Sequence, residues 1–118
     1  MKPIEQLVAR VFQARNIAHR EHHKTDSYSK HSALGSFYED IIPVIDEIIE
    51  TYQGRHELIG DYTVMDKKVS NITEYLIAEA AWIENNRKNI DVCPAVQNLI
   101  DGLAAIYLQT VYKLSNLS

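Results

Sequence analysis

The sequence predicts an all-α fold, a four-helix bundle, on three observations. Four long segments place apolar residues three and four positions apart, the spacing that lines one face of an α-helix. The 118 residues include only 4 Gly and 3 Pro, too few for the many turns of a β-sandwich or barrel. Hydrophobic residues make up 46% and charged residues 24%, as expected for one globular domain spanning residues 1–118.

The first half of the chain predicts two long helices. The first covers residues 2–23, and its apolar stripe turns polar near its end. Cap- and turn-forming residues at 24–29 then break the helix. The second helix covers residues 28–53 and ends before Gly54, a common C-terminal stop signal. Pro43 lies in its middle and predicts a kink, with two helices end to end as the alternative.

The second half predicts two more helices after a long connection. Residues 55–69 lack a clear pattern and hold at most a short helix or a short extended piece. Ser70 can cap a third helix over residues 71–86. A polar turn at 85–91 then leads to a fourth helix over residues 94–114. Short links predict antiparallel neighbours, whereas the long link from the second to the third helix permits a crossover along the bundle.

Charge and composition exclude several classes of protein. The net charge is −4, and the densest basic cluster is the pair Lys67–Lys68, so we expect no nucleic-acid partner. Apolar runs of five or six residues are far too short to cross a membrane. The single Cys93 excludes an intrachain disulfide and a CxxC motif. The use of a single cysteine predicts a cytoplasmic protein. Residues 1–12 also lack the apolar core of a signal peptide.

Four of the five histidines, His19, His22, His23 and His31, fall within thirteen positions. One interpretation is a solvated helix end followed by a polar turn. The other is a metal site, because neutral imidazole is a common ligand of first-row metals. An HExxH zinc protease is excluded, since Glu21 lies in the wrong register, and the Glu-x-x-His pairs of di-iron bundles are absent.

One spacing is more specific. His31 follows His19 by twelve residues, Asp46 follows His31 by fifteen, and Glu50 follows Asp46 by four. Taken alone, the two carboxylates are also typical of solvated residues beside an apolar stripe. The spacing as a whole resembles the ferroxidase motif of the Dps-like branch of the ferritin superfamily. The surroundings are similar too: Phe37 and Tyr38 follow the second histidine.

This resemblance implies a ferritin-like four-helix bundle with a shortened crossover between helices two and three. It also implies that His19 and His31 bind iron from one chain, while Asp46 and Glu50 bind it from a symmetry mate. The activity implied is oxidation of Fe(II) by peroxide or oxygen, and zinc can substitute for iron because it accepts the same ligands. We therefore expect a homo-oligomer, at least a dimer.

Helix geometry supports the division between two chains. His31 and Asp46 lie fifteen residues apart on one predicted helix, which is about 22 Å at about 1.5 Å per residue. No side chain spans that distance, so a site with all four ligands needs two chains related by a two-fold axis.

The sequence also departs from the resembled family. It has Gly35 where the family often has an acidic residue, and Arg20 where the family has a tryptophan. Gly35 favours a second hypothesis: a non-catalytic ferritin-like bundle that acts as an oligomeric structural or partner-binding protein. His22 and His23 are either further ligands or surface residues.

Overall fold

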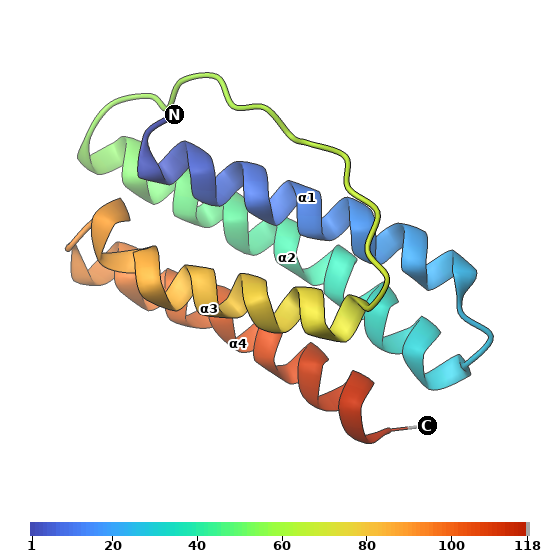
Figure 1. Ribbon diagram of the computed structural model, residues 1–118. Coiled ribbons are helices and arrows are strands. Elements are labelled where there is room, and N and C mark those ends of the chain that lie inside the picture. Colours follow the sequence, from blue (N-terminus) through green and yellow to red (C-terminus); the bar gives the residue numbers. More distant parts are fainter. Residues whose placement is uncertain (118) are drawn as a thin grey trace.

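The computed structural model describes residues 1–117 and contains four α-helices, as the periodicity predicts (Figure 1). They are α1 (Pro3–Lys24), α2 (Tyr28–Arg55), α3 (Ile72–Ile90) and α4 (Pro94–Asn116). No β-strand occurs in the described residues. The bundle measures 44 × 25 × 22 Å. Within residues 1–117, none of the four helices combines the length and apolar character that crossing a membrane requires.

The helices form a square in which each contacts two others. Helix α1 packs against α2 and α3, and α4 packs against the same two helices. In residues 1–117, the diagonal pairs α1–α4 and α2–α3 bring no Cα atoms within 8 Å of each other. Short links join α1 to α2 and α3 to α4, whereas residues 56–71 run back along the bundle (Figure 1). This single crossover makes α2 and α3 parallel and every contacting pair antiparallel.

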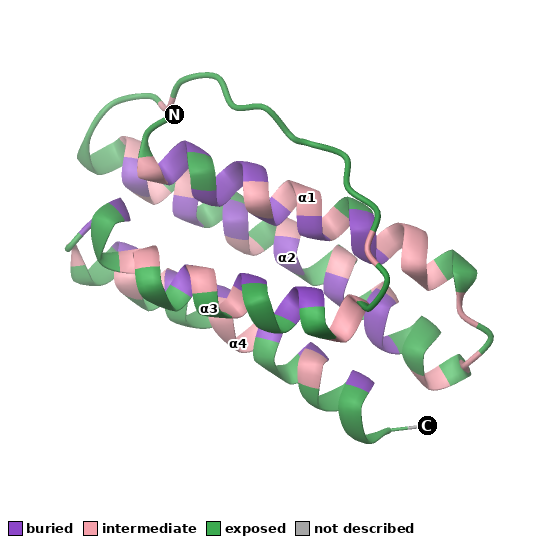
Figure 2. Cartoon of the chain, viewed as in Figure 1, coloured by how far each residue is buried: buried purple, intermediate pink, exposed green. Residues whose placement is uncertain are grey.

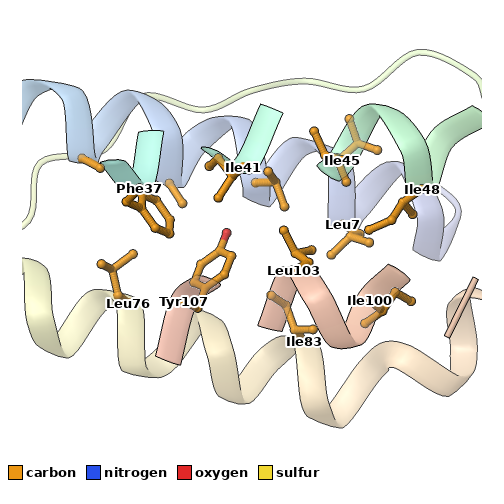
Figure 3. Close-up of a cluster of buried hydrophobic side chains, with 14 of the residues drawn as sticks. Leu7, Phe37, Ile41, Ile45, Ile48, Leu76, Ile83, Ile100, Leu103 and Tyr107 are labelled. Carbon is orange, nitrogen blue, oxygen red and sulfur yellow. The ribbon is translucent and has the colours of Figure 1, made fainter. Parts of the chain in front are cut away.

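All four helices contribute to one apolar core (Figure 3). Each helix has one buried side that faces the core and one side that is exposed (Figure 2). Phe37 of α2 meets Tyr107 of α4 edge to face, with ring centroids 5.0 Å apart. Pro43 is exposed, and α2 continues through it. The alternative of two helices end to end is therefore wrong.

The crossover contains no helix or strand, so neither the short helix nor the short extended piece that the sequence allows there forms in residues 56–71. Polar side chains of α1 hold it in place instead. Glu5 accepts hydrogen bonds from the backbone N–H groups of Gly60 (2.7 Å) and Lys2 (2.9 Å). Farther along, the side chain of Gln13 donates to the carbonyl oxygen of Met65 (3.0 Å). A Cβ at residue 60 would lie 3.2 Å from the Glu5 carboxylate, so glycine permits this close approach.

Glu5 makes stability depend on pH. Hydrogen bonds from the N–H groups of Gly60 and Lys2 hold the pKa of Glu5 below its ordinary value of 4.5. A carboxyl whose pKa is lowered in the folded state stabilises the protein at pH values above its ordinary pKa. This stabilisation is lost as the pH falls from the ordinary pKa through the lowered pKa of the folded state. Glu5→Gln should therefore lower the melting temperature at pH 7 and have a smaller effect at pH 3. An equal decrease at both pH values would contradict this role.

The turn between α3 and α4 is shorter than predicted. The polar stretch 85–91 was expected to be a turn, but α3 continues to Ile90, which is buried. The side chain of Arg87 extends to α4, where it donates to the side-chain oxygen of Gln97 (2.7 Å) and pairs with Asp101. These contacts satisfy the guanidinium group of Arg87 within the helix. The cap at the start of α3 is Asn71 rather than Ser70, and it accepts from the N–H of Glu74 (3.1 Å).

The fifth histidine has a structural role at the far end of α2. His56 Nε2 lies 2.9 Å from a carboxylate oxygen of Asp91, and the other oxygen lies 3.3 Å from Arg55 Nε. Asp91 also accepts from the N–H of Cys93 (3.1 Å). These contacts tie the end of α2 to the turn between α3 and α4.

Candidate metal site

Four histidines gather at the end of the bundle where α1 leads into α2. His19, His22 and His23 lie on the last turns of α1, and His31 lies on the first turn of α2. The three-residue link between the helices places these turns side by side. Ser27 caps α2 by accepting a hydrogen bond from the N–H of Lys30, at 3.3 Å. The polar C-terminal turns of α1 and the first turn of α2 therefore form a cluster of four histidines.

In this cluster, the imidazole rings of His22 and His31 are each held by a hydrogen bond to a backbone carbonyl oxygen. The rings are stacked, with centroids 3.6 Å apart and planes 20° apart. His22 Nδ1 lies 2.6 Å from the carbonyl oxygen of His31, and His31 Nδ1 lies 2.8 Å from the carbonyl oxygen of His22. A carbonyl oxygen only accepts, so both Nδ1 atoms are assigned as the protonated ones. Each neutral ring then keeps a lone pair on Nε2, the atom that can bind a metal.

His19 lies beside this pair and is kept neutral. Its ring stacks on Tyr38 of α2, with centroids 4.1 Å apart, and lies 6.2 Å from the ring of His22. Burial lowers the pKa of His19, and the neighbouring His23 and His22 lower it further. A lowered pKa keeps the imidazole uncharged at neutral pH, which is the form that a metal requires.

Gly35 makes room for the ring of His22. A Cβ at residue 35 would lie 3.1 Å from Cε1 and 3.3 Å from Nδ1 of that ring. A side chain at residue 35 would therefore require the ring of His22 to shift by a few tenths of an ångström. The sequence alone did not separate His22 from His23, because the match with Gly35 depends on how α1 packs against α2.

The predicted carboxylates lie on the same helix as His31 but far from it. Asp46 and Glu50 are exposed on α2, beside the buried Ile45 and Ile48. Neither makes a hydrogen bond or ion pair with any part of residues 1–117. The structure thus brings His19 and His31 to one cluster, with His22 between them, and leaves both carboxylates outside it.

One chain does not complete a metal site. In the described part of the chain, no three His, Cys, Asp or Glu side chains are grouped so that they could hold a metal ion. The histidine cluster offers nitrogen ligands only, and Asp46 and Glu50 offer oxygen ligands elsewhere on the surface. A mixed site built from these residues therefore requires ligands from a second chain.

A second polar cluster lies between α1 and α3. Burial raises the pKa of Glu79, whose carboxylate lies 3.3 Å from Arg10 Nη1. The Arg10 guanidinium also lies 4.4 Å from the ring centroid of Trp82. Arg10 thus neutralises a buried carboxylate and covers an aromatic ring, which indicates a packing role.

Comparison with known proteins places the chain in a family without assigning an activity. A family model matches residues 22–114, from His22 through most of α4. The chain belongs to DUF5856, a family of unknown function. The match includes His31, Asp46 and Glu50 but begins after His19. No curated protein and no solved structure matches the chain.

Proposed function

We propose that this DUF5856 protein is a Dps-like member of the ferritin superfamily. In this proposal it binds Fe(II) as its substrate at a site shared between two chains and oxidises it. The observation that carries the proposal is the hydrogen bond that fixes the tautomer of His31. Its Nδ1 atom is held by the carbonyl oxygen of His22 at 2.8 Å, so Nε2 is left for a metal. A ligating histidine that donates its other ring N–H to a backbone carbonyl is a common arrangement at metal sites.

The connectivity of the bundle supports this family. Ferritin-like folds are four-helix bundles with one long crossover connection. Here the only long link in the described residues joins α2 to α3 and runs along the bundle (Figure 1). Its sixteen residues carry no helix, which agrees with a shortened crossover.

A two-fold axis would complete the ligand set. If the α2 helices of two chains pack antiparallel, His31 of one chain lies opposite the end of the other chain's α2 that carries Asp46 and Glu50. The midpoint between residues 31 and 46 falls at Tyr38 and Glu39, so the axis crosses α2 there. Tyr38 and Ile42 are half-buried in the single chain and offer apolar surface near this point. The dimer would contain two such sites.

The ligand types suit the reaction. The neutral imidazoles of His19 and His31 bind Fe(II), while the carboxylates of Asp46 and Glu50 favour the more highly charged Fe(III) product. A coordination position left open admits peroxide or oxygen, which accepts the electrons from iron. Zinc would occupy the same ligands without changing its oxidation state.

Asp46→Asn tests the carboxylate side of the site. We expect this variant to bind at least about tenfold less Fe(II) at a given metal concentration, because the amide loses the negative charge that holds the ion. Anaerobic titration of metal-stripped protein with Fe(II) measures the loss. Asp40→Asn is the matched control, because Asp40 is also an exposed aspartate of α2 but lies on a different side of the helix.

Two results would contradict the proposal. If Asp46→Asn binds iron as the unmodified protein does, Asp46 is not a ligand. If the unmodified protein binds no iron at micromolar concentrations, the oxidising function is wrong. The alternative of a non-catalytic, oligomeric partner-binding bundle would then be favoured.

A further inference from the structure

We propose that a cavity between α1, α3 and the crossover binds a small amphipathic monocarboxylate, that is, an apolar molecule with one carboxylate group. The cavity has a volume of about 380 Å³, at the small end of the range of about 300–1,000 Å³ that is usual for ligand sites. The residues that line it include Ala9, Arg10, Gln13, Thr63, Met65 and Trp82. The histidine cluster lies elsewhere, at the junction of α1 and α2, so this inference does not rest on the proposed iron site.

Much of the cavity wall is apolar. Ala9 is buried on α1, and Trp82 is half-buried on α3. Met65 of the crossover is 63% exposed, although a thioether side chain packs well against apolar and aromatic groups. The apolar body of a ligand would cover Met65 and the indole ring of Trp82. Removal of this surface from water would favour binding.

Hydrogen bonds hold the crossover wall of the cavity in place. The side chain of Gln13 donates to the carbonyl oxygen of Met65 (3.0 Å) and accepts from the hydroxyl group of Tyr75 (3.0 Å). Farther along the crossover, the side chain of Arg20 donates to the carbonyl oxygen of Lys67 (3.2 Å). Contacts within the chain therefore fix the wall, so a ligand would bind with little further ordering of the protein.

Arg10 supplies the charge that selects a carboxylate. Among the described residues that line the cavity, it has the only charged side chain. Besides covering Trp82, its guanidinium makes one hydrogen bond within residues 1–117, from Nη1 to Glu79 at 3.3 Å. A guanidinium has five N–H donors, and this side chain is 37% exposed, so donors remain for a ligand carboxylate. Such charge-assisted hydrogen bonds are roughly twice as strong as neutral ones.

The neighbouring Glu79 favours a ligand with a single negative charge. Its carboxylate already shares the Arg10 guanidinium, and its Oε1 atom is buried without a hydrogen-bond partner in residues 1–117. A phosphate monoester carries about 1.5 to 2 negative charges at neutral pH, which is more than one shared guanidinium can balance. A carboxylate carries one. Removal of the charge of Glu79 should therefore strengthen binding of the ligand.

The test uses the fluorescence of Trp82, the only tryptophan of the chain, with octanoate as the probe. We expect octanoate to change the emission of Trp82 in a saturable way. Octanol has the same chain without the charge and should bind at least about tenfold more weakly, because its hydrogen bonds with Arg10 are weaker. Acetate has the carboxylate without the apolar chain and should not displace octanoate at equal concentration.

Substitutions separate the charge of Arg10 from the stability of the fold. Arg10→Met keeps an apolar stem and removes the donors, so octanoate should bind at least about tenfold more weakly. Because this change leaves Glu79 without its partner, the double variant Arg10→Met/Glu79→Gln repeats the test without a buried unpaired charge. Glu79→Gln alone should bind octanoate severalfold more tightly. Arg15→Met is the matched control, since Arg15 is an arginine of the same helix that does not line the cavity.

The methionine methyl groups provide a second readout that does not depend on Trp82. Met1 and Met65 are the only two methionines of the chain, and both line the cavity. In spectra of protein labelled with ¹³C at the methionine methyl groups, the signal of Met65 should shift as octanoate is added.

The outcomes decide both the site and the class of ligand. Unchanged Trp82 emission and an unchanged Met65 signal at millimolar octanoate would overturn the site. Equal binding of octanoate and octanol, or normal octanoate binding in both variants that lack Arg10, would overturn the carboxylate as the ligand. Weakened binding in those two variants, with normal binding in Arg15→Met, supports the inference. Iron binding is measured separately, so failure of the proposed function would leave this result unchanged.

Discussion

Replacement of His31 with alanine should abolish iron uptake while the bundle remains folded. We expect the affinity for Fe(II) to fall at least about a hundredfold, because losing a direct ligand costs more than the 10- to 100-fold typical of residues behind it. The substitution also removes the ring that stacks on His22, whereas the backbone carbonyl oxygen that contacts His22 Nδ1 remains. Anaerobic titration with Fe(II) measures it.

The control for this prediction is that the His31→Ala variant remains folded. His31 is exposed, so its removal should change the free energy of unfolding by about 1 kcal/mol or less, the typical value of one hydrogen bond. Circular dichroism should show unchanged helix content. Iron binding equal to that of the unmodified protein would remove His31 from the site.

Replacement of Phe37 with alanine should cost a large part of the stability of the fold. Its ring is 1% exposed and packs edge to face on Tyr107, so truncation leaves a cavity between α2 and α4 (Figure 3). Losses of about 3–5 kcal/mol are typical of such substitutions. Domains of this size are stable by only about 5–15 kcal/mol in total. Urea denaturation should therefore show a much lower midpoint.

Tyr28→Ala is the matched control for this core substitution. Tyr28 is an aromatic residue of the same helix but is 83% exposed. Its replacement should change the free energy of unfolding by about 0.5 kcal/mol or less. A loss below about 1 kcal/mol in Phe37→Ala would contradict the close packing between α2 and α4.

The periodicity of apolar residues was sufficient to predict the four helices. Its limits appear where polar side chains find partners that only the folded chain provides. Residues 85–91 were predicted to be a turn because they are polar, yet Arg87 and Asn86 are satisfied by Gln97 and by the carbonyl of Trp82. The crossover carries no element of its own because α1 side chains such as Glu5 supply its contacts.

The candidate site was predictable only in part, for a similar reason. Spacing identified His19 and His31, which lie in one cluster with the ring of His22 between them. The pairing of His22 with Gly35 required the packing of α1 on α2, which no local pattern specifies. The placement of Asp46 and Glu50 opposite those histidines is a property of two chains, so it stays a prediction.

Subunit mixing tests the shared site most directly. His31→Ala and Asp46→Asn should each bind little iron alone. When the two variants exchange subunits, each mixed dimer regains one intact site, built from His31 of one chain and Asp46 of the other. Random exchange makes about half of the dimers mixed, so iron binding should recover to about a quarter of the unmodified level. No recovery after demonstrated exchange would contradict a site shared between chains.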